Sequence, residues 1–280
     1  MLLDGKKLSA QILNSVKRKV AAQKLKIGLA VILVGEHPAS VAYVRQKRLA
    51  AEKVGFTFRE VNLPDSVSEK DLLAAIEKLN HDSKIQGFLV QLPLPKKINA
   101  QKILEKISPE KDVDGFNPLN FGRGFLKLPT LLPATPAGIL RLLDYYKIPL
   151  RGQNAVVVGH SNIVGKPLAM LLLNRDATVS VCHVFTKNLA EFTKRADIVI
   201  SATGVPNLIS AKMLKKGVAV IDCGGTKVSG KLVGDVDFEN VQKIAGAITP
   251  VPGGVGPMTV ATLIENTLRA AENFLKQGLS

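Results

Sequence analysis

The chain has 280 residues, 46% of them hydrophobic, and 38 Lys plus Arg against 23 Asp plus Glu give it a formal net charge of +15. No apolar run approaches the roughly 18 residues of a membrane span, and the apolar start is too short for a signal peptide, so we expect a cytoplasmic globular enzyme that enters no membrane. The positive charge would attract a polyanion such as a polyglutamylated substrate. However, the basic residues are spread over predicted helix faces and are not interleaved with the 3 Tyr and 10 Phe, so nucleic-acid binding is not expected.

From Lys26 onwards, apolar strand-like runs alternate with segments of helical periodicity, which is the pattern of βαβ units and a parallel sheet. Taken in chain order, the predicted elements are helix 8–21, strand 28–34, helix 39–54, strand 57–62, helix 70–80, strand 87–91, helix 138–146, strand 155–158, helix 167–174, strands 178–181, 198–202 and 218–221, and helix 260–275. The fold class is therefore α/β.

Two segments rich in Gly and Pro interrupt this alternation. The stretch 108–138 is the clearest, and a domain boundary is expected near its end. The loop 249–256 separates the last strand region from a helix that could return to the first domain. The sequence thus predicts two α/β domains.

A strand, a glycine turn and a helix start follow one another at 154–167. Gly159 and Gly165 flank the turn, and Pro167 suits the first turn of a helix. This context favours a pyrophosphate at the helix N-terminus, where the Ser161 hydroxyl could bind phosphate oxygens. The pattern is not G-x-G-x-x-G, so a plain tight turn is the alternative.

The end of the following strand bears on the choice of dinucleotide. An NAD site usually places an acidic residue about 20 residues beyond the turn, but this chain has Val181-Cys182-His183-Val184 there. The missing carboxylate favours NADP, although no arginine for a 2′-phosphate stands at His160 or Val184. The nearby candidate cations are His160, Lys166 and Lys187.

Tyr43 and Lys47 are four residues apart on a predicted helix and therefore share one face. The ring could stack on a flat heterocycle, and the lysine could transfer protons if burial lowers its pKa. Gln91, at the end of the apolar strand 87–91, could orient this lysine by a hydrogen bond. The alternatives are an ordinary helix-surface pair and a satisfied strand-end amide.

Asp112 and Asp114 straddle a valine just before a turn. A metal site would need further oxygen ligands, so none is expected. A single carboxylate, with Asp114 favoured, could accept two parallel N–H bonds from an aminopyrimidine edge, and turn capping is the alternative. The loop 249–259 is rigid enough in composition to approach a ligand or to act as an interdomain hinge.

The chain resembles the methylenetetrahydrofolate dehydrogenase/cyclohydrolase family of the bacterial FolD type over essentially its whole length. The matching motifs are YVRQK at 43–47, GFLVQLPLP at 87–95, KDVDGF at 111–116, TPAG at 135–138, GHSNIVGKP at 159–167 and TPVPGGVGPMTVATLIENT at 249–267. Their order and spacing make the resemblance specific.

The resemblance implies two α/β domains with a cleft between them, and usually a homodimer. Residues 1–138, completed by helix 259–280, would form the folate-binding catalytic domain, and 139–258 a Rossmann-type NAD(P)-binding domain. The implied function is the oxidation of 5,10-methylenetetrahydrofolate with NADP, or with NAD as the alternative, followed by hydrolysis to 10-formyltetrahydrofolate.

By this resemblance Tyr43 stacks on the folate, Lys47 transfers protons in the hydrolysis, Gln91 orients Lys47, and Asp114 anchors the pterin edge. The other residues implied at the folate are Val44, Val90, Leu92, Pro252, Gly253, Gly254, Val255 and Gly256. Those implied at the dinucleotide are Gly159, His160, Ser161, Thr135, Gly225 and Thr259.

Four departures from the family pattern concern the nucleotide side: His160, Val184, the pair Gly225-Thr226, and Ala134. The family often has arginine at the first of these positions, and a polar or basic residue at the second. They bear on the choice of NADP or NAD. They also leave open an enzyme that is mainly a cyclohydrolase with a weakened dehydrogenase.

Overall fold

A computed structural model describes residues 1–276 as two compact units. One unit consists of residues 10–134 and 260–276, and the other of residues 1–9 and 135–259. We call them the first and the second unit. Three helices pass from one to the other along the chain: α1 (Gly5–Ala22), α6 (Ala134–Tyr145) and α10 (Val255–Lys276).

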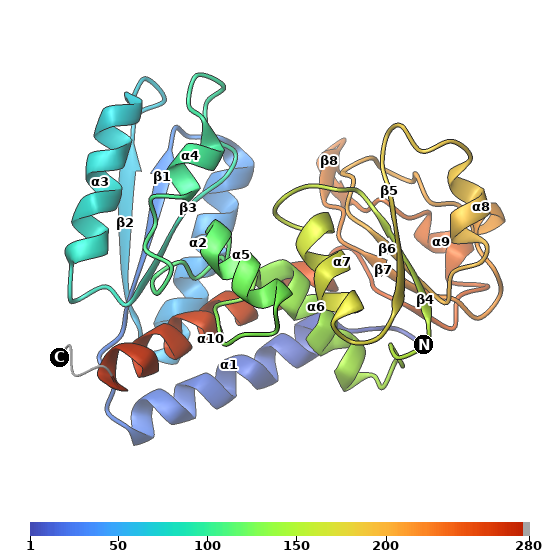
Figure 1. The fold of residues 1–280 in the computed structure, drawn as a ribbon, viewed down its shortest axis with the longest axis horizontal. Coiled ribbons are helices and arrows are strands. Elements are labelled where there is room, and N and C mark those ends of the chain that lie inside the picture. Colours follow the sequence, from blue (N-terminus) through green and yellow to red (C-terminus); the bar gives the residue numbers. More distant parts are fainter. Residues whose placement is uncertain (277–280) are drawn as a thin grey trace. The chain divides into compact units, whose positions relative to one another are not determined.

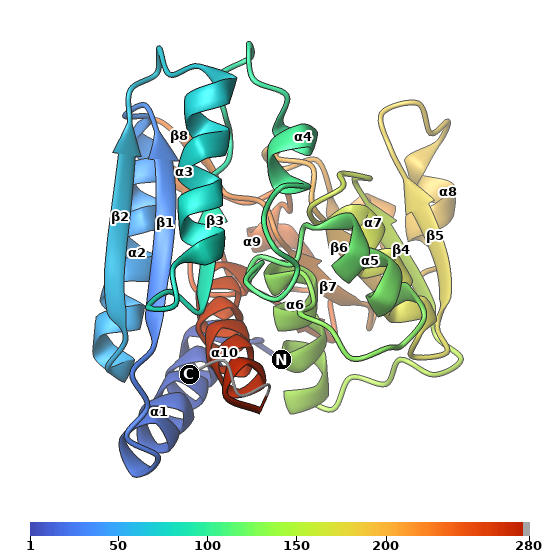
Figure 2. The same ribbon diagram turned by 60° about the vertical axis from the view of Figure 1, so that its left-hand side comes forward.

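The first unit is built on a parallel three-stranded sheet of order β2-β1-β3, made of β2 (Thr57–Leu63), β1 (Gly28–Val34) and β3 (Gly87–Val90) (Figure 1). All seven residues of β1 are buried because helices cover both faces. Leu29, Val31 and Leu33 pack with residues of α2 (Pro38–Val54) and α10. Their neighbours in the strand pack with α3 (Glu69–His81) and α4 (Ala100–Leu104) (Figure 2).

The second unit contains a parallel five-stranded sheet of order β10-β7-β6-β4-β5. Its strands are β4 (Asn154–Val158), β5 (Thr178–Cys182), β6 (Ile198–Ser201), β7 (Ala219–Asp222) and β10 (Ala247–Ile248). Helix α7 (Gly165–Leu173) packs against β4 and β5. Residues of three shorter elements pack against a core cluster of the sheet: α8 (Leu189–Thr193), the 3₁₀ turn Ala211–Met213 and α9 (Phe238–Val241). The order reverses at β4, which is the topological switch point of a doubly wound fold.

The predicted α/β class with two parallel sheets is confirmed. Each predicted strand and helix is present, and strand ends agree within one residue. All six predicted helices begin earlier than expected, three of them by at least three residues: α1 begins at Gly5, α6 at Ala134 and α10 at Val255. The last two residues of the expected loop 249–256 are therefore helical.

The sequence patterns do not predict the shortest elements. Helix α5 (Pro118–Phe125) lies within the Gly/Pro/Asn-rich stretch, where Pro118 takes the first helical position and the Asn117 side chain accepts a hydrogen bond from the Leu119 amide. The antiparallel hairpin of β8 (Thr226–Val228) and β9 (Lys231–Val233) is also unforeseen. Such elements are too short to show a period. No helix within residues 1–276 is long and apolar enough to cross a membrane.

Candidate active site

Helix α2 presents both residues of the predicted Tyr-x-x-x-Lys pair, but in different surroundings. Tyr43 is 42% exposed, whereas Lys47 is 5% exposed and shares the buried face of the helix with Ser40 and Val44. A lysine is rarely so enclosed, because its ammonium group loses hydration. Lys47 is therefore the residue of α2 whose burial calls for a chemical explanation.

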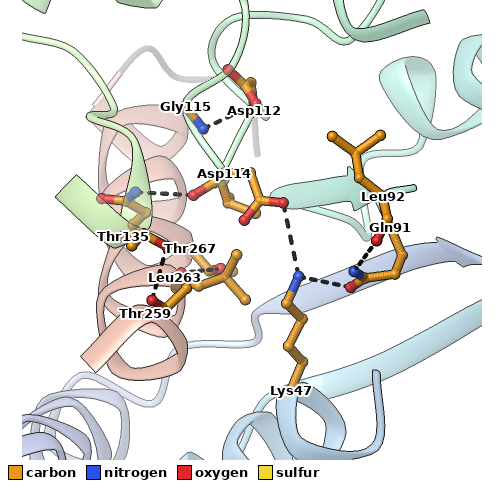
Figure 3. A network of polar contacts seen from close by, with 12 residues as sticks. Lys47, Gln91, Leu92, Asp112, Asp114, Gly115, Thr135, Thr259, Leu263 and Thr267 are labelled. Atoms are coloured by element: carbon orange, nitrogen blue, oxygen red, sulfur yellow. Dashed lines mark hydrogen bonds and ion pairs between the residues drawn. The ribbon is translucent and has the colours of Figure 1, made fainter. Parts of the chain in front are cut away.

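Three segments that are distant in sequence meet at the Lys47 Nζ (Figure 3). Nζ donates to the Gln91 Oε1 at 3.1 Å and lies 3.8 Å from the Asp114 Oδ2. The Gln91 Nε2 donates to the Leu92 carbonyl at 2.7 Å, which leaves Oε1 directed at the lysine. The structure thus brings together Lys47, Gln91 and Asp114.

Burial governs the protonation of this pair. It lowers the pKa of Lys47 below the ordinary lysine value, and the nearby Asp114 carboxylate offsets this only in part. Burial likewise raises the pKa of Asp114, against the influence of Lys47. A neutral amine held by two fixed acceptors can keep its lone pair for a third direction, which is the requirement for a general base.

The KDVDGF segment supports Asp114 from both sides. Lys111 Nζ donates to the carbonyls of Leu79 and Asp82, at the C-terminal end of α3. Val113 is fully buried, and Gly115 has a φ of +73°, which residues with a side chain rarely adopt. The turn is therefore fixed by its own residues.

The other predicted folate residues fall in two places. Val44 and Val90 are almost fully buried in the first unit, and Leu92 is half-buried there. The loop before α10 belongs to the second unit. In it Pro252 and Gly256 are exposed, Gly253 is half-buried, and Gly254 and Val255 are buried.

The predicted nucleotide turn has the close approaches that require its glycines. Gly159 has a φ of +109°, and a Cβ there would lie 2.4 Å from the Ala202 carbonyl oxygen. A Cβ on Gly165 would lie 2.0 Å from the Gly159 oxygen. The exposed Ser161 hydroxyl accepts a hydrogen bond from the Val164 amide at 3.2 Å and keeps its proton for a ligand. The turn has the form of an anion cradle at the start of α7.

A second histidine stands beside His160. The ring of His183, just after β5, lies 4.9 Å from the ring of His160, and both residues are exposed. The candidate cations expected from the sequence are His160, Lys166 and Lys187, and His183 is not among them. Lys166 donates to the Asn162 side chain. The paired ends of β4 and β5 could have indicated His183, because adjacent parallel strands end at the same edge.

The remaining predicted nucleotide residues are dispersed within the second unit. The Thr135 and Thr259 hydroxyls form a hydrogen bond of 2.9 Å, which ties the start of α6 to α10. Gly225 is exposed after β7. Within residues 1–276 no group of three or more His, Cys, Asp or Glu side chains is arranged to hold a metal ion.

Comparisons with known proteins decide the family. Residues 3–114 match the tetrahydrofolate dehydrogenase/cyclohydrolase catalytic domain, and residues 133–275 match the NAD(P)-binding domain of the same family. The chain belongs to the tetrahydrofolate dehydrogenase/cyclohydrolase family. A relative from a Nitratiruptor species, named bifunctional protein FolD, is 55% identical over 97% of this chain and 98% of its own length.

Solved structures of family members agree with this assignment. The bifunctional FolD enzyme of Campylobacter jejuni is 50% identical, with a TM-score of 0.95 over 98% of this chain and 99% of that one. The Trypanosoma brucei dehydrogenase-cyclohydrolase, solved with an NADP cofactor and an inhibitor, is 38% identical, with a TM-score of 0.95 over 98% of both chains.

Proposed function

We propose that this chain is a bifunctional one-carbon enzyme that oxidises 5,10-methylenetetrahydrofolate and hydrolyses the resulting methenyl group to 10-formyltetrahydrofolate. The observation that carries the proposal is the buried Lys47 between Gln91 and Asp114. Membership of the dehydrogenase/cyclohydrolase family, with full-length relatives named bifunctional, supports both activities. An enzyme that is mainly a cyclohydrolase is therefore not favoured.

Lys47 would act as the proton-transfer residue of the hydrolysis. With its pKa lowered by burial, the amine can take a proton from water as water attacks the methenyl carbon. The same group can then return the proton to the ring nitrogen that leaves. Gln91 would hold the amine in place and, as a neutral acceptor, would not raise its pKa as a carboxylate would.

Asp114 and Tyr43 would bind the folate. Apart from Lys47, no side chain in the described structure is paired with the Asp114 carboxylate, so it can accept parallel N–H bonds from the aminopyrimidine edge of the pterin. The exposed Tyr43 ring, one turn before Lys47, is available to stack on a flat ring. We assign the folate to these residues of the first unit.

The second unit would bind the dinucleotide, which supplies the hydride acceptor. The cradle of Gly159, Ser161 and Gly165 suits a pyrophosphate, since its amides and hydroxyl lie at a helix N-terminus. We favour NADP over NAD because no carboxylate follows β5 and because two imidazoles stand at that point. The NADP complex of the Trypanosoma brucei relative supports the same choice.

The charge and one surface of the chain suggest two partners. A net charge of +15 would favour a polyglutamylated folate over the monoglutamate, and raised salt would weaken that preference. The first unit also exposes the unpaired side of β2 next to apolar residues of α2, which supports a homodimer.

A spectrophotometric assay tests the proposal. Methylenetetrahydrofolate is supplied with NADP and, in parallel, with NAD, and methenyltetrahydrofolate hydrolysis is followed separately. Lys47→Met should abolish hydrolysis while folate binding remains, whereas Lys53→Met, exposed on the same helix, should behave as the wild type. Hydrolysis by Lys47→Met at the wild-type rate would exclude the assigned role, and a wild type without turnover would exclude the function.

A further inference from the structure

The Asp112 carboxylate is enclosed and fully engaged. Asp112 is 1% exposed. Its Oδ1 accepts the Gly115 amide at 3.1 Å, and its Oδ2 accepts the Asn117 amide at 2.7 Å and the Asn120 Nδ2 at 3.0 Å. All three donors follow Asp114 in the chain. An ionised carboxylate offers acceptors to all three donors and places no O–H group among the N–H groups.

A second layer fixes the orientation of Asn120. Its Oδ1 accepts the Thr130 hydroxyl at 2.6 Å, and its Nδ2 also donates to the Pro109 carbonyl at 2.9 Å. The amide therefore cannot turn its oxygen towards Asp112 without losing both bonds. The polar surroundings of Asp112 are specified for a carboxylate.

The turn that Asp112 closes carries Asp114. The Val113 carbonyl accepts from the Asn266 side chain at 2.9 Å, and the Asp114 carbonyl accepts from the Ala134 amide at 3.2 Å. On the other side, the Gly115 amide is shared between the Asp112 backbone carbonyl and the Asp112 Oδ1, both at 3.1 Å (Figure 3). The backbone of Asp114 is thus fixed before and after the residue, and its side chain is left facing Lys47.

We propose that Asp112 is a positioning residue for folate binding: its ionised carboxylate closes the 112–117 turn and so holds the Asp114 carboxylate where it meets the folate. Asp112 itself would touch neither the folate nor the dinucleotide. The inference rests on the role proposed above for Asp114.

If Asp112 has this role, its titration should appear in the pH dependence of the folate KM. Burial, with a smaller contribution from the negative Asp114, raises the pKa of Asp112 to about 6, although the donors from Asn117, Asn120 and Phe116 oppose the shift. Asp114 is itself paired with Lys47. Above pH 6 the turn is closed by a carboxylate. As the pH falls through 6, protonation removes an acceptor and folate binding weakens.

Asp112→Asn tests the inference, with Asp222→Asn as the matched control. Asp222 is 3% exposed, accepts the amides of Gly224, Asp235 and Val236, and also has a pKa raised by burial to about 6, but it lies in the second unit. The KM for folate, the KM for the dinucleotide and kcat are measured from pH 5 to 8 in both reactions.

The wild type should show a folate KM that rises as the pH falls through 6. Asp112→Asn, which leaves the Gly115 amide facing an N–H group, should raise the folate KM roughly tenfold at pH 7.5 and lose this pH dependence. Its kcat and its KM for the dinucleotide should not change. Asp222→Asn should keep the wild-type folate profile. A merely structural role would lower kcat through a smaller active fraction and leave the folate KM as it is.

Asn120→Asp decides the question if Asp112→Asn does not fold. It leaves Asp112 in place but puts a second carboxyl beside it, which should move the rise in folate KM to higher pH. An unmoved profile, a wild-type folate KM that is flat from pH 5 to 8, or a folded Asp112→Asn with the wild-type profile overturns the inference. A wild type without folate turnover counts instead against the proposed function.

Discussion

The burial of Lys47 gives the amine the lowered pKa that proton transfer requires, and it also lowers the stability of the fold. Its ammonium form is desolvated, and the same burial that lowers its pKa opposes the folded state at neutral pH. Asp114 carries the matching cost, since burial raises its pKa. The attraction between the two buried charges, 3.8 Å apart, offsets only part of the free energy that is lost when both groups are desolvated.

We therefore expect Lys47→Met combined with Asp114→Asn to make the protein more stable and inactive. Both replacements keep the side-chain size and remove the charge, so the free energy of unfolding should rise by about 1 to 4 kcal/mol at pH 7. Denaturant unfolding measures it. Lys47→Met alone should be less stable than the double variant, because Asp114 is then left buried without its cation. A double variant less stable than the wild type would contradict this account.

At the scale of residues, the sequence predicts which side chains meet but not all that hold them. Lys47, Gln91 and Asp114 are found from helix spacing, from the end of a buried strand and from the family motifs, and the structure places them together. The carboxylate role of Asp112 could not be predicted. It depends on donors from a short helix that has no periodic pattern, and on which face of the turn is buried.

A buried lysine stabilises the C-terminal end of helix α3. Lys111 donates to the last carbonyls of the helix, where the helix dipole favours positive charge. Lys102 pairs with Glu69 at the opposite end of α3, but its side chain is exposed. The two lysines therefore give a matched comparison on one helix.

Lys111→Met should lower the free energy of unfolding by about 2 kcal/mol, because the buried Leu79 carbonyl and the partly buried Asp82 carbonyl lose their charged donor. Burial already lowers the pKa of Lys111, so part of the lost interaction is returned as relieved desolvation. Lys102→Met should have a much smaller effect. Equal losses in the two variants, measured by denaturant unfolding, would contradict the capping role.

The nucleotide turn gives the second element-scale prediction. A methyl group on Gly165 meets the Gly159 carbonyl, so Gly165→Ala must displace the turn at the start of α7. We expect the dehydrogenase activity to fall at least tenfold through a higher KM for the dinucleotide, while methenyltetrahydrofolate hydrolysis continues. Gly122→Ala, where the new Cβ meets nothing within 4 Å, is the control. Parallel loss of both activities in Gly165→Ala would show that the turn does more than bind the dinucleotide.

Elements were predictable in proportion to their length and burial. The apolar runs 28–34 and 155–158 are strands because both faces of each sheet are covered, so alternation is absent and the run itself is the signal. The hairpin β8–β9 has exposed residues in both strands. Ser229 and Gly230 in its turn both have positive φ angles, but of these two residues only the glycine indicates such a turn in the sequence. Its strands have three residues each, too few for a pattern.

For the molecule as a whole, the alternation of strands and helices predicted the α/β class, and the Gly/Pro-rich segments together with the family resemblance predicted two units. Assembly depends on surface detail. A groove of about 1260 Å³ on the first unit runs between α2 and the free side of β2. Val41 and Leu49, both largely exposed, lie along it. Its charged residues have both signs: Glu36, Arg45, Glu60 and Asp65.

A second copy of the chain suits this surface better than a partner of one charge. In a two-fold interface the same surface of both copies is in contact, so an acidic residue of one copy can pair with a basic residue of the other. The apolar residues of both copies are buried at the same time. An exposed strand edge is also a usual place for self-association. We expect sedimentation to give twice the chain mass of 30.0 kDa for the wild type at micromolar concentration.

Leu49→Asp should give a folded monomer, because it places two unpaired carboxylates in the interface, one from each copy. Leu173→Asp is the matched control, since Leu173 is equally exposed but belongs to α7 in the second unit. It should leave the dimer intact. Circular dichroism verifies that both variants are folded. A wild type that sediments as a monomer, or a Leu49→Asp variant that stays dimeric, would mean that α2 and β2 do not form the interface.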